Sequence, residues 1–163
     1  MSILAIDPGN AFSGYAIINP QTCQPIRVGK IPNAEILDLI KNTTHSHVVI
    51  EMIASYGMPV GAEVFETCVW IGRFQQALIE RRGITPELIK RHPVKMHLCH
   101  SARAKDSNIT KALVDRFAPG AKNHGKGTKA NPGWFHGFAK DAWAAYALAV
   151  YTADTLLVGT RTV

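Results

Sequence analysis

Three acidic residues occupy positions from which a carboxylate could take part in chemistry. Asp7 directly follows the apolar run of residues 2–6, and Glu51 follows the apolar run of residues 47–50. Runs of this length predict buried strands, so each carboxylate would stand where a strand ends. Asp141 lies near the start of a predicted helix, where the helix dipole favours a negative charge. Asp7 could instead simply cap the Asp-Pro-Gly turn, and the dipole alone could account for Asp141.

The order of the predicted elements brings the first two acids together. The strand ending at Glu51 follows a helix, so we expect it to join the first strand in parallel through a right-handed crossover. Ligands of open α/β sheets collect at the carboxyl ends of such strands. Clustered carboxylates repel one another unless divalent cations neutralise them, and oxygen ligands suit Mg²⁺ or Mn²⁺. Two such ions about 4 Å apart can activate a water and stabilise the leaving oxygen of a phosphodiester.

The remaining elements follow from hydrophobic periodicity and turn residues. Strands are predicted over residues 2–6, 12–19, 25–31, 47–50 and 87–90, and helices over 34–41, 63–82, 93–98, 108–117 and 138–157. Asn33 is the expected N-cap of the first helix, and Asp106 or Ser107 that of the fourth. Trp70 and Phe74 of the long helix suit either packing within the chain or a dimer interface.

Composition and charge narrow the class of protein. The chain has 163 residues, 47% of them hydrophobic and 18% charged, as expected of an ordinary globular domain. It carries 18 Lys and Arg against 12 Asp and Glu, a net charge of +6 that favours polyanionic partners, nucleic acid first. No apolar stretch is long enough to cross a bilayer, and no signal-peptide pattern is present. We therefore expect a soluble protein of the cytoplasm, in a bacterial cell or a phage-infected one.

The cysteines do not suggest a disulfide framework, because they are three in number and scattered. Cys68 lies in an apolar helical stretch and is expected in the core. His92, His97, Cys99 and His100 crowd together, but their spacing matches no strong zinc pattern.

An ordered set of short motifs resembles one known family. They are Ile-Asp-Pro-Gly at 6–9, with segments 13–16, 49–51, 69–74, 93–95, 104–109, 140–141 and 147–149. Together they resemble the RuvC family of Holliday-junction resolvases, especially its phage-type members, within the RNase H-like superfamily. An Asp-x-Gly after a strand also occurs in actin-like folds, so the order and spacing of the whole set carry the resemblance.

The resemblance implies a fold and an activity. The fold is α/β and RNase H-like, with a central five-stranded mixed sheet, three antiparallel strands then two parallel, flanked by helices. Residues 1–163 would form a single nuclease domain. The activity implied is that of a homodimer that cuts opposed strands of a four-way DNA junction, and related branched DNA, with two Mg²⁺ ions per active site; Mn²⁺ would substitute.

The resemblance also assigns roles to residues. Asp7, Glu51 and Asp141 match catalytic, metal-binding acids of the family. Members usually carry a further acid, or a His and Asp pair, three residues apart on the last helix, where this chain has Ala144. We expect His136 or Lys140 to compensate in part.

Basic residues are the candidates for contact with DNA. Lys105 matches a basic position of the family's phosphate-contacting segment, and Lys111 lies in the predicted helix 108–117 that follows. The Gly- and Lys-rich stretch 119–135 predicts a mobile loop, in which Trp134 and Phe135 could stack on unpaired bases. Ordinary solvated lysines and a plain disordered loop are the alternatives. The full set of predicted DNA-binding residues is Lys105, Lys111, Lys126, Lys129, His136 and Lys140.

Other functions remain open at this stage. A non-catalytic junction-binding protein would explain Ala144, and an RNase H-like RNA-processing nuclease would use the same acids. An actin-like ATP-binding protein is disfavoured, because the chain is too short for two domains and lacks a second phosphate loop.

Overall fold

A five-stranded sheet lies at the centre of the molecule, in the order β3-β2-β1-β4-β5. The computed structural model describes residues 1–160, with side chains through residue 156. The strands are β1 (Ile3–Asp7), β2 (Phe12–Ile18), β3 (Pro25–Pro32), β4 (His47–Met52) and β5 (Glu87–Lys90). β1, β2 and β3 pair antiparallel, whereas β4 and β5 add in parallel. The predicted mixed sheet is confirmed.

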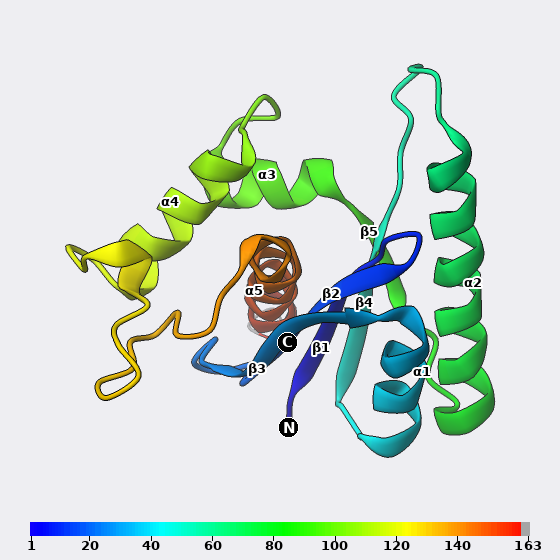
Figure 1. The fold of residues 1–163 in the computed structure, drawn as a ribbon, viewed down its shortest axis with the longest axis horizontal. Helices are drawn as coiled ribbons and strands as arrows, with labels where there is room; N and C mark the ends of the chain where they lie inside the picture. The colour runs from blue at the N-terminus through cyan, green and yellow to red at the C-terminus, as the bar shows by residue number, and fades with distance from the viewer. Residues whose placement is uncertain (161–163) are drawn as a thin grey trace.

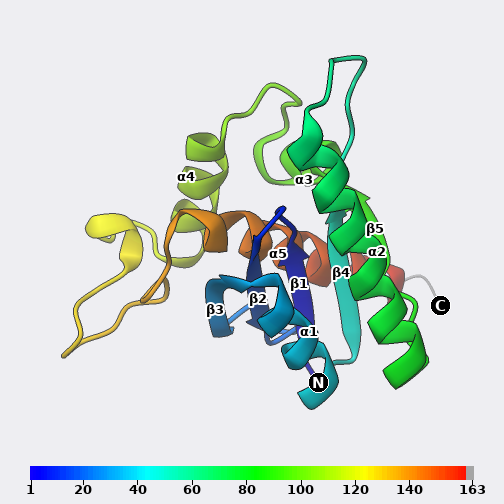
Figure 2. The same cartoon turned by 45° about the vertical axis from the view of Figure 1, so that its right-hand side comes forward.

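Helices cover both faces of this sheet, as Figures 1 and 2 show. The α-helices are α1 (Asn33–Asn42), α2 (Ala62–Arg82), α3 (Arg91–Cys99), α4 (Asp106–Phe117) and α5 (Lys140–Thr160). α1 and α2 pack on one face, where Leu4, Ile6 and Ile50 are buried. α5 packs on the other face, with α3 and α4 beside it. Within residues 1–160, no helix is both long and apolar enough to cross a membrane.

The face that carries α5 is the one that receives the acids. Side chains alternate along a strand, so Asp7 shares a face with Ile3 and Ala5, and Glu51 shares a face with Val49. Ile3, Ala5 and Val49 all belong to the core cluster formed with α5. Both carboxylates therefore point to the α5 side of the sheet.

Gly14 lets α5 approach the sheet closely. A Cβ placed on Gly14 would lie 2.5 Å from the carbonyl oxygen of Asp141. Gly14 is also the register partner of Asp7 on β1 and of Lys30 on β3. The first turn of α5 therefore lies directly over the row of the sheet that contains Asp7.

Two helix starts differ from the prediction. Asn33 is not an N-cap: it lies inside the first turn of α1 and is 1% exposed, and its side chain donates to the Gly9 carbonyl and accepts from the Ser13 hydroxyl. The Gly9 carbonyl in the turn after Asp7 needs a hydrogen-bond donor, and the Asn33 side chain supplies it instead of capping α1. α4 begins at Asp106, so Asp106 and Ser107 lie in its first turn, and Asn108 accepts a hydrogen bond from the Lys105 backbone N–H.

The long helix α2 buries fewer of its apolar side chains than expected. Phe74 is fully buried, whereas Phe65 and Val69 are each 63% exposed. Cys68 is half-buried instead of lying in the core. A Cβ on Gly72 would meet no heavy atom of the described chain within 4 Å, so this glycine does not mark close helix packing there.

The Gly- and Lys-rich stretch is held by its aromatic side chains, so the predicted role of Trp134 and Phe135 in base stacking is wrong. Phe135 is fully buried in the α5 core cluster. Trp134 stacks on Phe117 of α4 at a centroid distance of 5.2 Å, and its indole N–H donates to the Tyr146 hydroxyl. These partners are distant in sequence, which is why local composition did not reveal them.

Candidate active site

A cavity of about 260 Å³ opens at the carboxyl ends of β1 and β4, and we call it the acidic cavity. Its charged lining residues are Asp7, Glu51, Asp106, Asp141, Arg91 and Lys140. The three acids predicted from the sequence are therefore brought together from β1, β4 and the first turn of α5. Sequence reasoning had treated Asp106 only as a helix cap and did not name Arg91.

Asp7 is half-buried and has no counter-ion of its own. Within the described part of the chain its side chain makes no hydrogen bond or ion pair, so it does not cap the Asp-Pro-Gly turn. Ser13 and Asn33 hold that turn instead, since Ser13 accepts from the Gly9 N–H at 3.2 Å and Asn33 donates to the Gly9 carbonyl at 2.8 Å. A Cβ on Gly9 would lie 2.3 Å from the Phe12 carbonyl oxygen, so only glycine fits this turn.

Burial and neighbouring charge perturb two of the carboxyl groups. Burial and, to a lesser degree, the charge of Glu51 raise the pKa of Asp7 to about 7, although the positive charge of Arg91 opposes them. Burial also raises the pKa of Glu51, against the opposing effect of Arg91. Carboxyl groups whose pKa is perturbed in this way cluster at functional sites.

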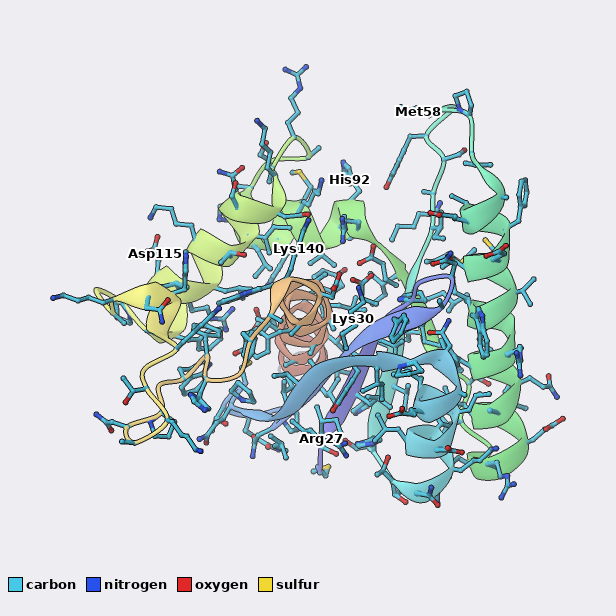
Figure 3. All side chains as sticks on the ribbon, in the orientation of Figure 1. Arg27, Lys30, Met58, His92, Asp115 and Lys140 are labelled. Atoms are coloured by element: carbon cyan, nitrogen blue, oxygen red, sulfur yellow. The ribbon has the colours of Figure 1, made fainter. Side chains whose placement is uncertain are left out.

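Two basic side chains pair with the other acids. Arg91 Nε lies 3.2 Å from Glu51 Oε1, and Arg91 Nη1 lies 3.6 Å from Asp106 Oδ1. Lys30 Nζ lies 2.8 Å from Asp141 Oδ2. Figure 3 shows Lys30 on β3 beside the start of α5, and Lys140 on α5 itself. Sequence reasoning missed Arg91 and Lys30. Arg91 directly follows β5, just as Glu51 lies at the end of β4, so a search for charged residues at strand ends could have found Arg91.

The donor chemistry of the cavity fits a hard divalent ion. The side-chain ligands available are carboxylate oxygens, which Mg²⁺ and Mn²⁺ prefer, and Asp7 is a half-buried acid that has no ion pair among the described residues. Among the described residues, no group of three His, Cys, Asp or Glu side chains is already arranged to hold a metal. Glu51 and Asp141 face Arg91 and Lys30 instead, so these side chains must turn before all three acids share an ion.

The other predicted site residues lie at different distances from this cavity. Lys140 lines it, and so does Ala144, so the position of the family's further acid does face the site. His136 lines a different cavity, beside β3, and so the expectation that it compensates for Ala144 is wrong.

The remaining predicted DNA contacts lie outside the acidic cavity. Lys105 is exposed and directly precedes α4, next to Asp106. Lys111 pairs with Asp115 one turn along α4. Lys126 and Lys129 lie in the stretch that Phe135 and Trp134 fasten to the core, Lys126 half-buried and Lys129 exposed.

The fold of this chain is similar to that of solved structures. No protein-family model and no curated protein sequence matches the chain. The structure of Thermus thermophilus RuvC superimposes with a TM-score of 0.71 at 16% sequence identity, over 98% of each chain. The chain has the RNase H-like fold of RuvC. T. thermophilus RuvC in complex with Holliday junction substrate superimposes with a TM-score of 0.69 at 14% identity, over 98% of this chain and 97% of that one. The resemblance to phage-type members in particular stays a prediction.

Proposed function

We propose that this protein is a structure-selective DNA endonuclease that resolves four-way junctions, with residues 1–163 forming one nuclease domain. The observation that carries the proposal is the meeting of Asp7, Glu51 and Asp141 in one cavity at the carboxyl ends of β1 and β4. The likeness to a RuvC in complex with Holliday junction substrate supports the choice of branched DNA over other polyanions. The net charge of +6 supports a nucleic acid partner.

Asp7, Glu51 and Asp141 would hold two Mg²⁺ ions, or Mn²⁺ in their place. When bound, such ions would activate a water molecule and stabilise the leaving oxygen of a phosphodiester. Asp7 would contribute a half-buried carboxylate at the end of a central strand, and Glu51 stands on the neighbouring parallel strand. Asp141 reaches the same cavity because Gly14 allows α5 to lie against β2.

Basic residues around the cavity would hold the DNA backbone. Lys140 lines the cavity, so it is placed to contact the phosphate being cut. Lys105 lies next to Asp106 and can contact a neighbouring phosphate. Lys111, Lys126, Lys129 and His136 would neutralise the arms of the junction further from the acids.

A homodimer would cut the two opposed strands of a junction. The exposed side chains Phe65 and Val69 lie one turn apart on α2 and form an apolar patch on its outer face. Large exposed apolar side chains that cluster in this way often mark a protein interface. Phe74, which the sequence offered as a dimer contact, is fully buried within the chain and cannot belong to this patch. Trp70 is half-buried.

A second candidate function is a junction-binding protein without catalytic turnover. Ala144 faces the acidic cavity without a carboxylate, and Glu51 and Asp141 are paired with Arg91 and Lys30. This candidate predicts tight binding to four-way junctions that remain uncut.

The experiment is cleavage of an end-labelled mobile four-way junction, beside matched duplex DNA, single-stranded DNA and RNA. Each is incubated with the protein in Mg²⁺, in Mn²⁺ and in EDTA. The proposal expects paired nicks in the junction that require a divalent ion. A bound but uncut junction in both metals supports the non-catalytic candidate, and cutting of RNA alone would replace the proposal with an RNA-processing one.

A further inference from the structure

Arg91 occupies a bridging position between two acids of the acidic cavity. Its Nε atom lies 3.2 Å from Glu51 Oε1, and its Nη1 atom lies 3.6 Å from Asp106 Oδ1. The Glu51 side chain is 16% exposed, whereas that of Asp106 is 69% exposed. One guanidinium at the start of α3 therefore contacts a mostly buried carboxylate and a solvated one at the same time.

The buried partner is the one that a divalent ion would need. Glu51 stands beside Asp7 on the adjacent parallel strand, with Ile6 and Ile50 paired in register just before them. Asp7 has no ion pair within the described residues, whereas Asp106 lies at the exposed start of α4. A divalent ion that binds Asp7 and Glu51 would repel a guanidinium held on the same carboxylate.

We propose that Arg91 is a positioning residue that neutralises Glu51 while no metal is bound and passes to Asp106 when a divalent ion binds. This inference rests on the proposed metal-dependent function. Arg91 keeps its charge at any accessible pH, so its ion pair can hold the Glu51 side chain in place beside the cavity. Once the metal is bound, the Asp106 carboxylate would pair with Arg91 and keep it beside the cavity. There the positive charge of Arg91 would also attract a phosphate of the DNA.

The arrangement has two measurable consequences. Arg91 competes with the metal for Glu51, so removing it should strengthen metal binding. Asp106 offers Arg91 an alternative partner, so removing Asp106 should weaken metal binding, but only while Arg91 is present. If Asp106 were itself a metal ligand, its removal would weaken binding whether or not Arg91 was present.

The experiment is calorimetric titration of the full chain with Mn²⁺ in the absence of DNA. Arg91→Gln should bind Mn²⁺ about ten-fold more tightly than the wild type, the size expected when a close, half-buried ion pair no longer opposes the metal. Lys95→Gln is the matched control: Lys95 also acts electrostatically on Glu51, but forms no ion pair with it in the described chain. It should change the affinity by less than about three-fold, because its half-buried ammonium lies beyond ion-pair distance of Glu51 and the interaction weakens with distance.

Two further variants complete the design. Arg91→Lys keeps a cation that can compete for Glu51, so its affinity should lie near that of the wild type. Asp106→Asn should weaken Mn²⁺ binding, and this effect should vanish in the double variant Arg91→Gln/Asp106→Asn, as a double-mutant cycle would measure. Tighter binding by Arg91→Gln cannot arise from misfolding, which would only weaken the site.

The outcomes separate the inference from the proposed function. Wild-type binding that is lost in Asp7→Asn, with Arg91→Gln tighter than Lys95→Gln, supports both. Equal affinities for Arg91→Gln and Lys95→Gln overturn the inference and leave the metal site standing. An Asp106→Asn effect that persists without Arg91 also overturns it, and makes Asp106 a ligand. Absence of Mn²⁺ binding by the wild type overturns the proposed metal site and the inference together.

Discussion

Replacement of Gly14 by Ala tests whether the position of α5 builds the site. The added Cβ would lie 2.5 Å from the Asp141 carbonyl oxygen and 3.2 Å from its carbonyl carbon. Backbone atoms cannot rotate away as a side-chain tip can, so the first turn of α5 must move by at least about 0.5 Å to restore a tolerable contact. Asp141 would move with that turn, away from Asp7 and Glu51.

The expected loss has two parts. Overpacking of this kind typically costs about 1–3 kcal/mol of stability. A misplacement of about 1 Å of a reacting group can cost about 100-fold in rate, so a shift of about 0.5 Å should cost about ten-fold. Gly14→Ala should therefore fold, bind junctions normally and cut them about ten-fold more slowly.

The assay combines urea unfolding with single-turnover cleavage of a four-way junction. Gly72→Ala on α2 is the matched control, because the added Cβ meets no heavy atom of the described chain within 4 Å. It should stabilise the helix by about 1 kcal/mol and leave cleavage unchanged. If Gly14→Ala cut junctions as fast as the control, α5 would not be positioning Asp141 as we infer.

Four further predictions follow from individual residues. Glu51→Gln should slow cleavage by more than about 100-fold while junction affinity stays within about three-fold, and a normal cleavage rate would remove Glu51 from the site. Lys105→Ala should reduce the slope of log affinity against log salt by about 0.9, as expected for one phosphate contact, and an unchanged slope would exclude it from the interface. Because the pKa of Asp7 is raised from 3.8 to about 7, the folded protein keeps a proton that the unfolded chain has lost between these values. The stability of the metal-free protein should then fall as the pH rises from about 4 to about 7. In urea unfolding with EDTA at pH 8, Asp7→Asn should be more stable than the wild type by roughly 1–3 kcal/mol. Equal stability of the two proteins would contradict the argument that burial raises the pKa of Asp7. Phe65→Glu should shift the mass measured by light scattering from dimer to monomer, since losing one buried large apolar side chain costs about 1.5–3 kcal/mol, and an unchanged dimer would place the interface elsewhere.

The sheet and the meeting of the acids could be predicted because both depend on local signals. The apolar runs before Asp7 and Glu51 have the length of buried strands, and the helix between them forces a parallel crossover. The Ala-rich face of the last helix indicated close packing, and the Gly14 contact confirms it.

The cations of the site could not be predicted in the same way. Lys30 pairs with Asp141 because Gly14 on β2 is the register partner of Lys30 and also lies against the backbone of Asp141. The sequence around Lys30 does not reveal this arrangement. The prediction for Trp134 and Phe135 failed for a related reason. Their neighbours in the sequence are Gly133 and His136, but their partners Phe117 and Tyr146 lie on α4 and α5.

Asn33 illustrates a conflict between two correct rules. Asn before an apolar helix is commonly an N-cap, yet here the turn after Asp7 contains polar backbone groups that must be satisfied. The Asn33 side chain satisfies the Gly9 carbonyl, and the helix begins without a side-chain cap. Here the hydrogen bond to the turn takes the place of the helix cap.

The most direct test of the account compares junction cleavage by the wild type and Asp7→Asn in Mg²⁺, with binding measured on the same preparations. The account predicts paired cuts by the wild type that disappear in EDTA, and an Asp7→Asn variant that binds the junction as tightly but leaves it intact. Equal cutting by both proteins, or cutting that persists without a divalent ion, would contradict the claim that these acids form a metal-dependent nuclease site.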